Sequence, residues 1–557
     1  MAHDGKNWTR RLALGGGAAA AAALGYFALR PGQGTGPRIT LDPTTFHRGN
    51  AAEPDTLDPS QIQGTWEDQI LGDLLVGLTT ADAKDEPIPG MATSWETTPD
   101  GLVWTFHLRE ALWSDGEKVT AEDFVFSWRH TLDPKTAAPY AYFLYPIKNA
   151  QTVNAGKAPP DTLGARAVDP LTLQVTLEHP VPYMVHMLMH HTFYPQPRHV
   201  VTAKGKEWTR PGNFVGNGAF VLKEWVPNSQ VVVEKNPRFY DADNVKLQRV
   251  IFYPSTDYSA ALRSLRAGEL DVQDRYPGGQ LAWIKQNMPE LLAPLPQMTA
   301  EFISINFKRK PLDDVRVRAA ISLTVNREMD VQRIRRGGEQ EAYNIVPPGT
   351  ANYPGGVFLP FKDTPYEQRL AQAQRLMQEA GFGPDNRIKL TYAIRSTAPG
   401  VYRAEAAAFQ QALALIYINI TILPFDAAIF YNTVQEHDYD LAQVGWAADF
   451  DDAATFLELF VTGGANNYGE YASKIFDAML AASRQDVDVD VRGKRLAEAE
   501  AILLKDHVFV PIFFWTNTNM VRPYVKGWEA NKMDTHRDRW VSIDAEEQKA
   551  TFAGGAK

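Results

Sequence analysis

The sequence contains no cysteine at any of its 557 positions. That absence excludes disulfides, zinc sites built on thiolates, thiol catalysis and lipid attachment through an N-terminal cysteine. The chain also has no G-x-S-x-G hydrolase motif, no P-loop and no G-x-G-x-x-G after a predicted strand. It has no excess of positive charge, because its net charge is −10, and a nucleic-acid partner is therefore not expected.

The N-terminal region, residues 1–38, is expected to be an export segment with a linker. Arg10 and Arg11 precede an apolar, Gly/Ala-rich run over residues 13–29. A basic start followed by a short apolar run is typical of a secretory signal, and the paired arginines resemble a twin-arginine signal. No clear A-x-A cleavage site follows, so an uncleaved anchor in the inner membrane is the alternative. In either case we expect the bulk of the protein to lie outside the cytoplasm, in the periplasm.

The rest of the composition is that of an ordinary globular protein. A chain of 557 residues is too long for one hydrophobic core, so two or three domains are expected. Hydrophobic residues make up 44% and charged residues 22%, which argues against both disorder and a membrane bundle. Aromatic residues are numerous, with 13 Trp, 21 Tyr and 27 Phe, and such side chains fill cores or line clefts for organic ligands.

Short strands alternate with helices along the chain and predict a mixed α/β fold. Period-two alternation of apolar side chains predicts strands over 103–108 and 171–177. Thr120 is a candidate N-cap for an amphipathic helix over 121–132, which ends before Pro134. Further strands are expected at 231–234, 250–253 and 513–515, and further helices at 259–267, 315–323 and 366–380.

A late apolar segment, residues 445–450, ends in an acid. It reads as a short strand that carries Trp446 and finishes at Asp449, and a helix-like run over 453–460 follows. An acid beside an aromatic ring at a strand end can hold a ligand ammonium by charge-assisted hydrogen bonds and a neighbouring ring face. The alternative is that Asp449, or an aspartate just after it, only caps the following helix.

A series of motifs runs through the chain in a fixed order, and together they resemble one known family. They are TLDP at 56–59, DLLVGL at 73–78, PGMATSWE at 89–96, WTFHLR at 104–109, WSDGEKVTAEDF at 113–124, DP at 133–134, PYA at 139–141, NGAF at 217–220, EKNP at 234–237, Asn306, DVRVRAA at 314–320 and GW at 445–446. The chain resembles the extracytoplasmic solute-binding proteins of peptide ABC transporters, the oligopeptide- and dipeptide-binding family (solute-binding protein family 5). The match covers nearly everything after about residue 40.

The resemblance implies an α/β fold with two lobes, the class II periplasmic-binding-protein fold, with an additional third domain and a ligand cleft between the lobes. Lobe I is expected to combine 39–75, 200–301 and 517–547, the additional domain to cover 76–199, and lobe II to cover 302–516. In the family, the ligand backbone pairs with strand-like segments of both lobes, and roomy wet pockets accept its side chains. The implied function is to bind an oligopeptide or dipeptide outside the cytoplasmic membrane and deliver it to an ABC permease for uptake.

The resemblance also assigns roles to individual residues. Asp449 matches the aspartate that receives the peptide α-amino group, which leaves helix capping to Asp451 and Asp452. One matched segment, at 445–447, pairs with the ligand backbone, and a facing segment in the first lobe lies at 63–65. The expected ligand-binding residues are Asp449, Trp446, Gly445, Ala447, Gln443, Gln63, Gly64 and Thr65.

The chain departs from the family where a peptide carboxylate is often bound. Gln443 and Val434 stand where an arginine is often found, and Gln63 replaces a usual glutamate. A glutamine donates hydrogen bonds but does not neutralise a carboxylate. The C-terminal end of the ligand is therefore read differently, by another basic group, or is absent. The candidate basic groups are Arg333, Arg335, Arg336, Arg395 and Arg403, each of which also fits a solvated surface charge.

One histidine cluster gives a minor alternative. His186 and His190 have the i, i+4 spacing that suits a transition metal on a helix, and His191 follows them. The segment lacks the glutamate of H-E-x-x-H, and we favour a packed apolar segment with partly exposed histidines. No metal site and no cofactor is therefore expected.

Four functions follow from these observations. The first is a monomeric binding protein whose partners are a peptide and the membrane subunits of an ABC permease. The second is a binding protein for a non-peptide or modified-peptide ligand, such as a cell-wall peptide, an opine or a metal chelate, and Gln443 favours it. An extracytoplasmic hydrolase would need a nucleophile and base brought together by the fold, and no enzymatic activity is expected. An anchored structural or chaperone-like protein requires an uncleaved N-terminal segment.

Overall fold

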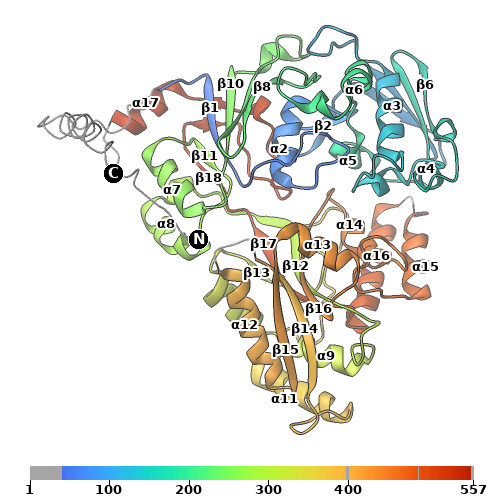
Figure 1. Ribbon diagram of the computed structural model, residues 1–557, viewed down its shortest axis with the longest axis vertical. Coiled ribbons are helices and arrows are strands. Elements are labelled where there is room, and N and C mark those ends of the chain that lie inside the picture. The colour runs from blue at the N-terminus through green and yellow to red at the C-terminus, as the bar shows by residue number, and fades with distance from the viewer. Residues whose placement is uncertain (1–40, 397–399, 487, 554–557) are drawn as a thin grey trace, which may run out of the picture. The chain divides into compact units, whose positions relative to one another are not determined.

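The computed structural model describes residues 41–396, 400–486 and 488–553 of the chain (Figure 1). Residues Asp42–Lys557 form one compact unit, and the account below concerns that unit alone. The predicted export segment at 1–38 lies outside the described residues. Within the described residues, no helix has the length and apolar character needed to cross a membrane.

The N-terminal sheet brings together segments from the start, middle and end of the chain. Its strands, in spatial order, are β18 (Met520–Val521), β11 (Val272–Gln273), β1 (Thr45–Asn50), β10 (Arg249–Pro254), β9 (Gln230–Lys235) and β8 (Phe220–Val226). β1 runs parallel to both β10 and β11, whereas β18 runs antiparallel to β11. Because β18 comes from near the end of the chain and β1 from near its start, the sheet joins segments that are far apart in sequence.

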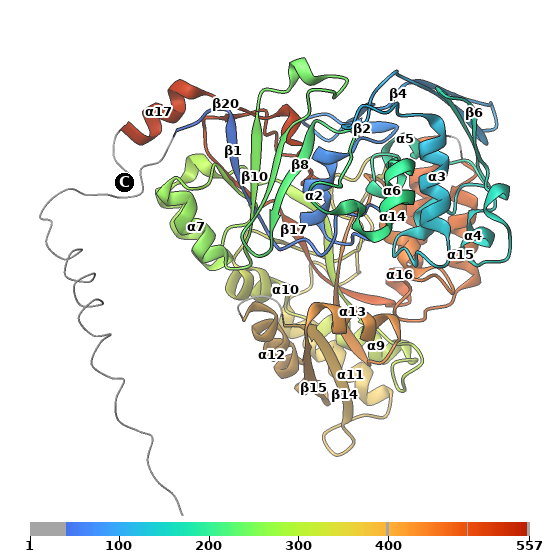
Figure 2. The same cartoon turned by 45° about the horizontal axis from the view of Figure 1, so that its top comes forward.

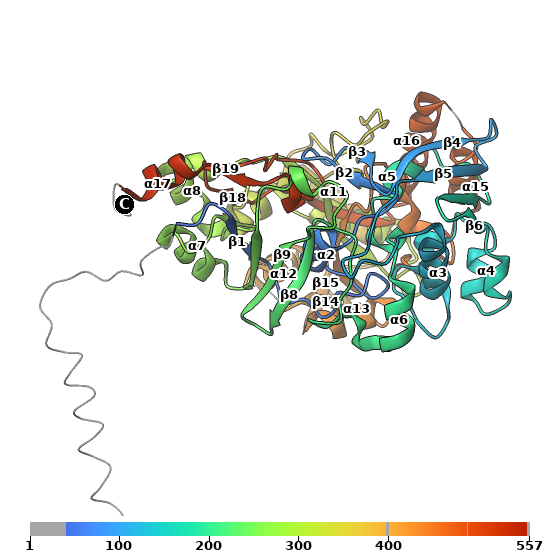
Figure 3. The ribbon, with the colours of Figure 1, turned by 90° about the horizontal axis from the view of Figure 1, so that it is seen from above.

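A separate four-stranded antiparallel sheet follows β1 in the sequence. Its order is β4 (Ala92–Thr97), β5 (Val103–Leu108), β7 (Thr172–Thr176) and β6 (Ala165–Asp169). In β5 the side chains of Trp104, Phe106 and Leu108 are buried, as the period-two alternation predicts. Helix α3 (Ala121–Leu132) begins at a capping box formed by Thr120 and Asp123. Figure 3 shows α3 with α4 (Ala150–Asn154) beside β6.

The C-terminal sheet carries the segment of greatest interest. Its order is β13 (Gln340–Glu341), β17 (Phe509–Thr516), β12 (Pro296–Ile305), β16 (Leu441–Ala447), β14 (Ile388–Arg395) and β15 (Ile418–Phe425). β16 is antiparallel to β12 and parallel to β14. Helix α12 (Val401–Ala414) packs on β14 and β15, and α11 (Tyr366–Glu379) packs on α9 (Val315–Thr324); Figure 2 shows α11 and α12 beside β14 and β15.

The remaining elements connect or cover these sheets. Besides short 3-10 turns, they include α2 (Thr65–Leu74), β2 (Thr79–Ala81), β3 (Pro87–Pro89), α5 (Met184–Met187), α6 (Arg198–Lys204), α7 (Tyr258–Ala267), α8 (Leu281–Asn287), α10 (Arg327–Met329), η8 (Asp330–Arg335), α13 (Ala427–Gln435), α14 (Ala454–Leu457), η9 (Glu458–Phe460), α15 (Lys474–Ser483), α16 (Val489–Lys505), β19 (Val525–Lys526), β20 (Ser542–Ile543) and α17 (Ala545–Ala553).

Two large apolar clusters form the core, and the segment after β16 joins them. One cluster surrounds the N-terminal and four-stranded sheets, and the other fills the C-terminal sheet and its helices. Phe450 and Ala454 belong to the first cluster, whereas Val444 and Ala453 belong to the second. The end of β16 is therefore fixed by packing on both sides. The residue boundaries expected for the lobes remain a prediction, because residues Asp42–Lys557 form a single compact unit.

Most expected elements form where the sequence places them. The helix expected at 121–132 and the strand at 103–108 have those bounds in the structure, and the helix at 366–380 ends one residue earlier, at Glu379. The helical face that the minor metal-site alternative required of His186 and His190 does not form, whereas the favoured packed apolar segment does, with Met184 and Met187 buried. Helix α5 ends at Met187, and the His190 side chain instead accepts a hydrogen bond from the Thr192 N–H at the start of a short 3-10 turn.

Candidate functional site: an open strand edge beside Asp449

The end of β16 has a free edge. Its ladder with β12 continues to the pair Thr299 and Ala447, but its ladder with β14 ends at Ala442. Among the described residues, positions 443–447 therefore have no strand partner on the β14 side. A row of unpaired main-chain groups of this kind can accept another strand.

The direction of the main-chain groups identifies which residues face that edge. The N–H of Ala448 donates to the Met298 carbonyl of the β12 segment, at 2.7 Å. Along an antiparallel strand, the main-chain groups of successive residues face opposite neighbours. Trp446 therefore faces β12 like Ala448, and the N–H and C=O of Gly445 and Ala447 face the open edge.

Gly445 leaves room for a buried ion pair beside this edge. A Cβ atom at position 445 would lie 2.5 Å from a carboxylate oxygen of Glu301 and 3.5 Å from Nη2 of Arg395. Glu301 is fully buried and accepts from Arg395 at 3.2 Å and from the indole N–H of Trp515 at 3.3 Å. Arg395 also donates to the hydroxyl of Tyr402 at 2.8 Å. Any side chain at position 445 would displace this pair.

Asp449 lies two residues beyond the end of β16 and is half-buried. Its carboxylate accepts a hydrogen bond from the Thr455 hydroxyl at 3.3 Å, and no cation lies within ion-pair distance among the residues that the structure describes. Burial raises the pKa of Asp449 to about 7, although the Thr455 hydrogen bond lowers it. A cation that reaches this carboxyl group would stabilise its ionised form and lower its pKa.

Aromatic side chains from distant segments surround Asp449. Burial, and next the charge of Asp449, raise the pKa of both Tyr140 and Tyr142, which follow α3 in the chain. The neighbouring ring of Phe450 stacks on Tyr183, with centroids 4.7 Å apart, and meets Phe143 edge-on at 6.1 Å. These contacts place an acid and several rings where residues from 140 to 183 meet the end of β16. Such surroundings suit a ligand ammonium.

The capping roles fall differently among the three aspartates. Asp452 precedes the N-cap position of α14, which is Ala453, but it accepts from the N–H of Ala454 and also pairs with Arg492. Asp451 does not cap; it accepts from the N–H of Ala351 at 2.9 Å and pairs with Lys532. Asp449 makes no cap either, which leaves its carboxylate available.

The expected facing segment, Gln63, Gly64 and Thr65, forms the start of α2. Gly64 is the N-cap residue, and the N–H groups of Gln63 and Gly64 donate to the Glu67 carboxylate at 3.1 and 2.8 Å. Those two donors are therefore occupied, whereas Thr65 N–H makes no hydrogen bond to the described residues. No hydrogen bond or ion pair joins this segment to the end of β16 among the described positions.

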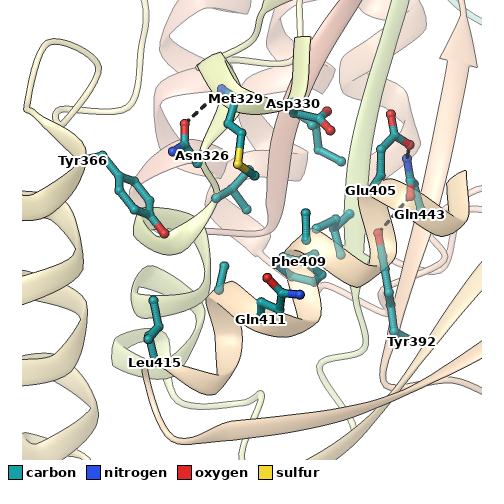
Figure 4. A pocket seen from close by; sticks show the side chains of 15 residues that line it. Asn326, Met329, Asp330, Tyr366, Tyr392, Glu405, Phe409, Gln411, Leu415 and Gln443 are labelled. Carbon is teal, nitrogen blue, oxygen red and sulfur yellow. Dashed lines mark hydrogen bonds between the residues drawn. The ribbon is translucent and has the colours of Figure 1, made fainter. Parts of the chain in front are cut away.

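Gln443 is not exposed at the edge but fully buried beneath it. Its amide N–H donates to Glu405 at 2.9 Å, and its oxygen accepts from the hydroxyl of Tyr392 at 3.0 Å. Figure 4 shows Gln443 with Glu405 and Asp330 in the wall of a cavity of about 320 Å³ between α12 and the sheet. Burial, and next the charge of Glu405, raise the pKa of Asp330 to about 8. Asp449 does not line this cavity.

The five candidate arginines separate into two groups. Arg335 pairs with Glu405 at 2.5 Å and with Glu339 at 3.5 Å, and Arg395 pairs with Glu301. The other three, Arg333, Arg336 and Arg403, are exposed. The buried Arg335 and the half-buried Arg395 already have carboxylate partners inside the chain. A further arginine, Arg275, was missed from the sequence because only the tertiary fold brings it to Trp515, with its guanidinium carbon 5.7 Å from the ring.

The histidine cluster packs against aromatic rings. His190 stacks on Phe143 with centroids 4.2 Å apart, and His191 lies 3.4 Å from a carboxylate oxygen of Asp68. Within the part of the chain that the structure describes, no three metal-binding side chains gather in one place.

Comparison with known proteins places these features in context. A family model described as "Bacterial extracellular solute-binding proteins, family 5 Middle" matches residues 86–468. The periplasmic oligopeptide-binding protein OppA of Salmonella typhimurium is 34% identical over 87% of this chain and 90% of that protein. The periplasmic murein peptide-binding protein MppA of Escherichia coli is also 34% identical, over 86% of this chain and 89% of its own length.

Solved structures agree with the sequence comparison. The crystal structure of Haemophilus influenzae OppA in complex with RPPGFSPFR has a TM-score of 0.82 and 32% identity, and it covers 90% of this chain and 99% of that one. The expected fold class, α/β with two lobes and an additional domain, is therefore confirmed.

Proposed function

The chain belongs to the bacterial extracellular solute-binding proteins of family 5, and from this premise we propose that it binds a peptide outside the cytoplasm and delivers it to the permease of an ABC transporter. The members of this family are substrate-binding proteins, and the relatives named above are periplasmic. The peptide enters as an extra strand, because main-chain pairing gives affinity without reading side chains.

One observation carries this proposal, and it is the open edge of β16 that ends at an acid without an ion-pair partner. Gly445 and Ala447 offer donors and acceptors to a ligand backbone, and Asp449 takes the ligand α-ammonium. Thr65, at the start of α2, offers the facing main-chain donor. The protein acts as a monomer whose ligand-bound form is presented to the membrane subunits. The arginine pair at Arg10 and Arg11 directs its export.

Native mass spectrometry of the protein from its own host tests the ligand class. A series of bound ligands with the masses of short peptides would support the proposal. A single bound ligand with a defined non-peptide mass would contradict it.

The first variant to test is Asp449→Asn, because it removes the charge and keeps the shape. We expect peptide affinity to fall at least about tenfold by calorimetry, since the ammonium loses its counter-charge in a half-buried site. The matched control is the same peptide with its amine acetylated, whose affinity should not differ between wild type and Asp449→Asn. Unchanged affinity for the free-amine peptide would remove Asp449 from the site.

A modified peptide is the second candidate ligand, and Gln443 favours it. The buried Gln443 hydrogen-bonds Glu405 and Tyr392 and supplies no positive charge to a ligand carboxylate. One relative is named for murein peptide, which is a peptide of the cell wall. A mass ladder whose members carry a constant offset from ordinary peptides would favour this candidate over the first.

A further inference from the structure

A second candidate site lies inside the C-terminal part of the chain, between helix α12 and its sheet. It is the cavity of about 320 Å³ described above, and its lining residues differ in exposure. Asp330 and Glu405 are buried in its floor, whereas Met329 and Leu415 are exposed at its rim (Figure 4). The cavity therefore opens at the surface near the ends of α10 and α12. Asp449 and the open edge of β16 do not line it.

The walls of this cavity are mostly apolar. Phe409 and Tyr392 contribute rings that meet edge-on, with centroids 5.1 Å apart, and aliphatic side chains come from Ile303, Val325 and Ile512. An apolar cavity of about 150 Å³ holds one benzene molecule, so this one has room for an aromatic ring with a short chain. An apolar pocket of this size with a few polar groups is typical of a small-molecule site.

The carboxyl group of Asp330 has no partner at the floor of the cavity. Its residue is 7% exposed, its Oδ2 accepts no hydrogen bond, and no cation lies within ion-pair distance among the residues that the structure describes. By contrast, Glu405 on the same floor pairs with Arg335 and accepts from Gln443. A buried carboxyl group without a partner is costly, and a cation that hydrogen-bonds to it would offset that cost.

The charges around Asp330 favour a cation over an anion in this cavity. Burial raises the pKa of Asp330 to about 8, and the charge of Glu405 adds to this effect. Glu339 and Glu301 act in the same direction, whereas Arg335 opposes them. An anion in the cavity would add to this repulsion between negative charges, and a cation would relieve it.

We propose that this cavity binds a small organic amine, whose ammonium group pairs with Asp330 and whose aromatic or apolar body fills the space beside Phe409. The amine enters as an ammonium, and a proton held by Asp330 goes to solvent. The ammonium donates charge-assisted hydrogen bonds to the carboxylate, and the body of the ligand removes apolar wall from water. This site is separate from the proposed peptide site and does not depend on it.

Calorimetry with phenethylamine tests this site, and 2-phenylethanol, a neutral molecule of similar shape, is the matched ligand. We expect wild type at about pH 8 to bind the amine at least about tenfold more tightly than the alcohol, because only the amine supplies a charge. Asp330→Asn should bind both compounds alike. The control Asp385→Asn removes an exposed acid outside the cavity and should bind like wild type.

Two further variants separate the cavity from Asp449, the other acid that suits an ammonium. Asp449→Asn should keep its affinity for phenethylamine, and loss of that affinity would assign the amine to the peptide site. Ala412→Phe fills the cavity from its half-buried wall, so it should abolish amine binding and leave peptide affinity unchanged.

The contrary outcomes are equally distinct. The proposal is overturned by the absence of saturable amine binding to wild type, by an amine preference that survives in Asp330→Asn, or by full amine affinity in Ala412→Phe. If Asp330→Asn does not fold, Ala412→Phe decides the question. Peptide titration of the same samples reports separately on the proposed function, which stands or fails without regard to the amine.

Discussion

Asp449 has a carboxyl group that titrates near neutrality, and this couples its charge to pH. Burial raises its pKa to about 7, above the usual value of 3.8, and the nearest polar contact is the Thr455 hydroxyl. In the free protein the group therefore takes up a proton as the pH falls through 7. A bound ammonium would favour the ionised form and release that proton.

This coupling predicts that peptide affinity falls in acid. Below about pH 7 the peptide amine is already protonated, with an ordinary pKa of about 7.7 to 8.0, so the pH change acts on the carboxyl group. Binding must then release one proton from Asp449, and affinity should fall up to about tenfold per pH unit between pH 7 and 5. Calorimetry across this range measures the slope.

Asp449→Asn and the acetylated peptide are the two controls for that slope. Neither combination contains the ammonium–carboxylate pair, so both should give flat profiles over the same range. A profile for wild type that is as flat as that of Asp449→Asn would mean that another group holds the amine.

Among the elements, β16 supplies most of the proposed site. One of its edges pairs with β12, and the other has no strand partner beyond Ala442. The β12 edge is paired through Trp446 and Ala448, and the opposite edge is open at Gly445 and Ala447. Proline is tolerated in a strand only where its missing N–H would face away from a partner strand. The two kinds of position in β16 therefore respond differently to proline.

Ala447→Pro should weaken peptide binding and leave the fold intact. The substitution removes an N–H that faces the open edge and puts ring atoms where the ligand backbone would lie. We expect at least about a tenfold loss of affinity with little change in melting temperature. Ala448→Pro is the matched comparison, because it removes the hydrogen bond to Met298 and should lower the melting temperature. Full affinity in a folded Ala447→Pro would exclude strand addition at this edge.

Local patterns predicted elements well where the sequence itself contains the signal. The buried alternation of β5 and the Thr120 capping box of α3 need only neighbours in sequence, and both form as expected. The spacing of His186 and His190 fits the same kind of rule, but α5 ends at Met187 and His190 stacks on Phe143 instead. A local period predicts an element only when tertiary contacts do not compete with it.

The site was predictable in part, for a different reason. Asp449 and the segment at 445–447 were expected from resemblance, and the open edge at that segment gives the expectation a physical basis. Glu301, Arg395 and Trp515 are far apart in sequence, and no local pattern brings them together. Gln443 was expected to contact the ligand, and its burial between Glu405 and Tyr392 could be seen only in the folded chain.

For the molecule as a whole, the chain order requires most of the protein to be folded before binding is possible. Thr65 begins the helix that follows β1 of the N-terminal sheet, Asp449 follows a strand of the C-terminal sheet, and Tyr140 lies in the sequence between β5 and β7. A ligand that contacts all three stabilises the folded chain by mass action, to a degree set by its concentration relative to Kd. Folding of this chain requires no disulfide formation, and therefore no oxidising compartment, because the sequence has no cysteine.

The last prediction concerns export of that whole molecule. If Arg10 and Arg11 form a twin-arginine signal, replacing both with lysine should leave the protein in the cytoplasm of its host. Arg30→Lys, at the other end of the apolar run, keeps the pair and should be exported like wild type. Fractionation followed by mass measurement of the exported protein checks both expectations. A shortened soluble product indicates cleavage, and a full-length membrane-bound product indicates an anchor. Normal export of the double-lysine variant would exclude the twin-arginine signal, since that signal requires the paired arginines.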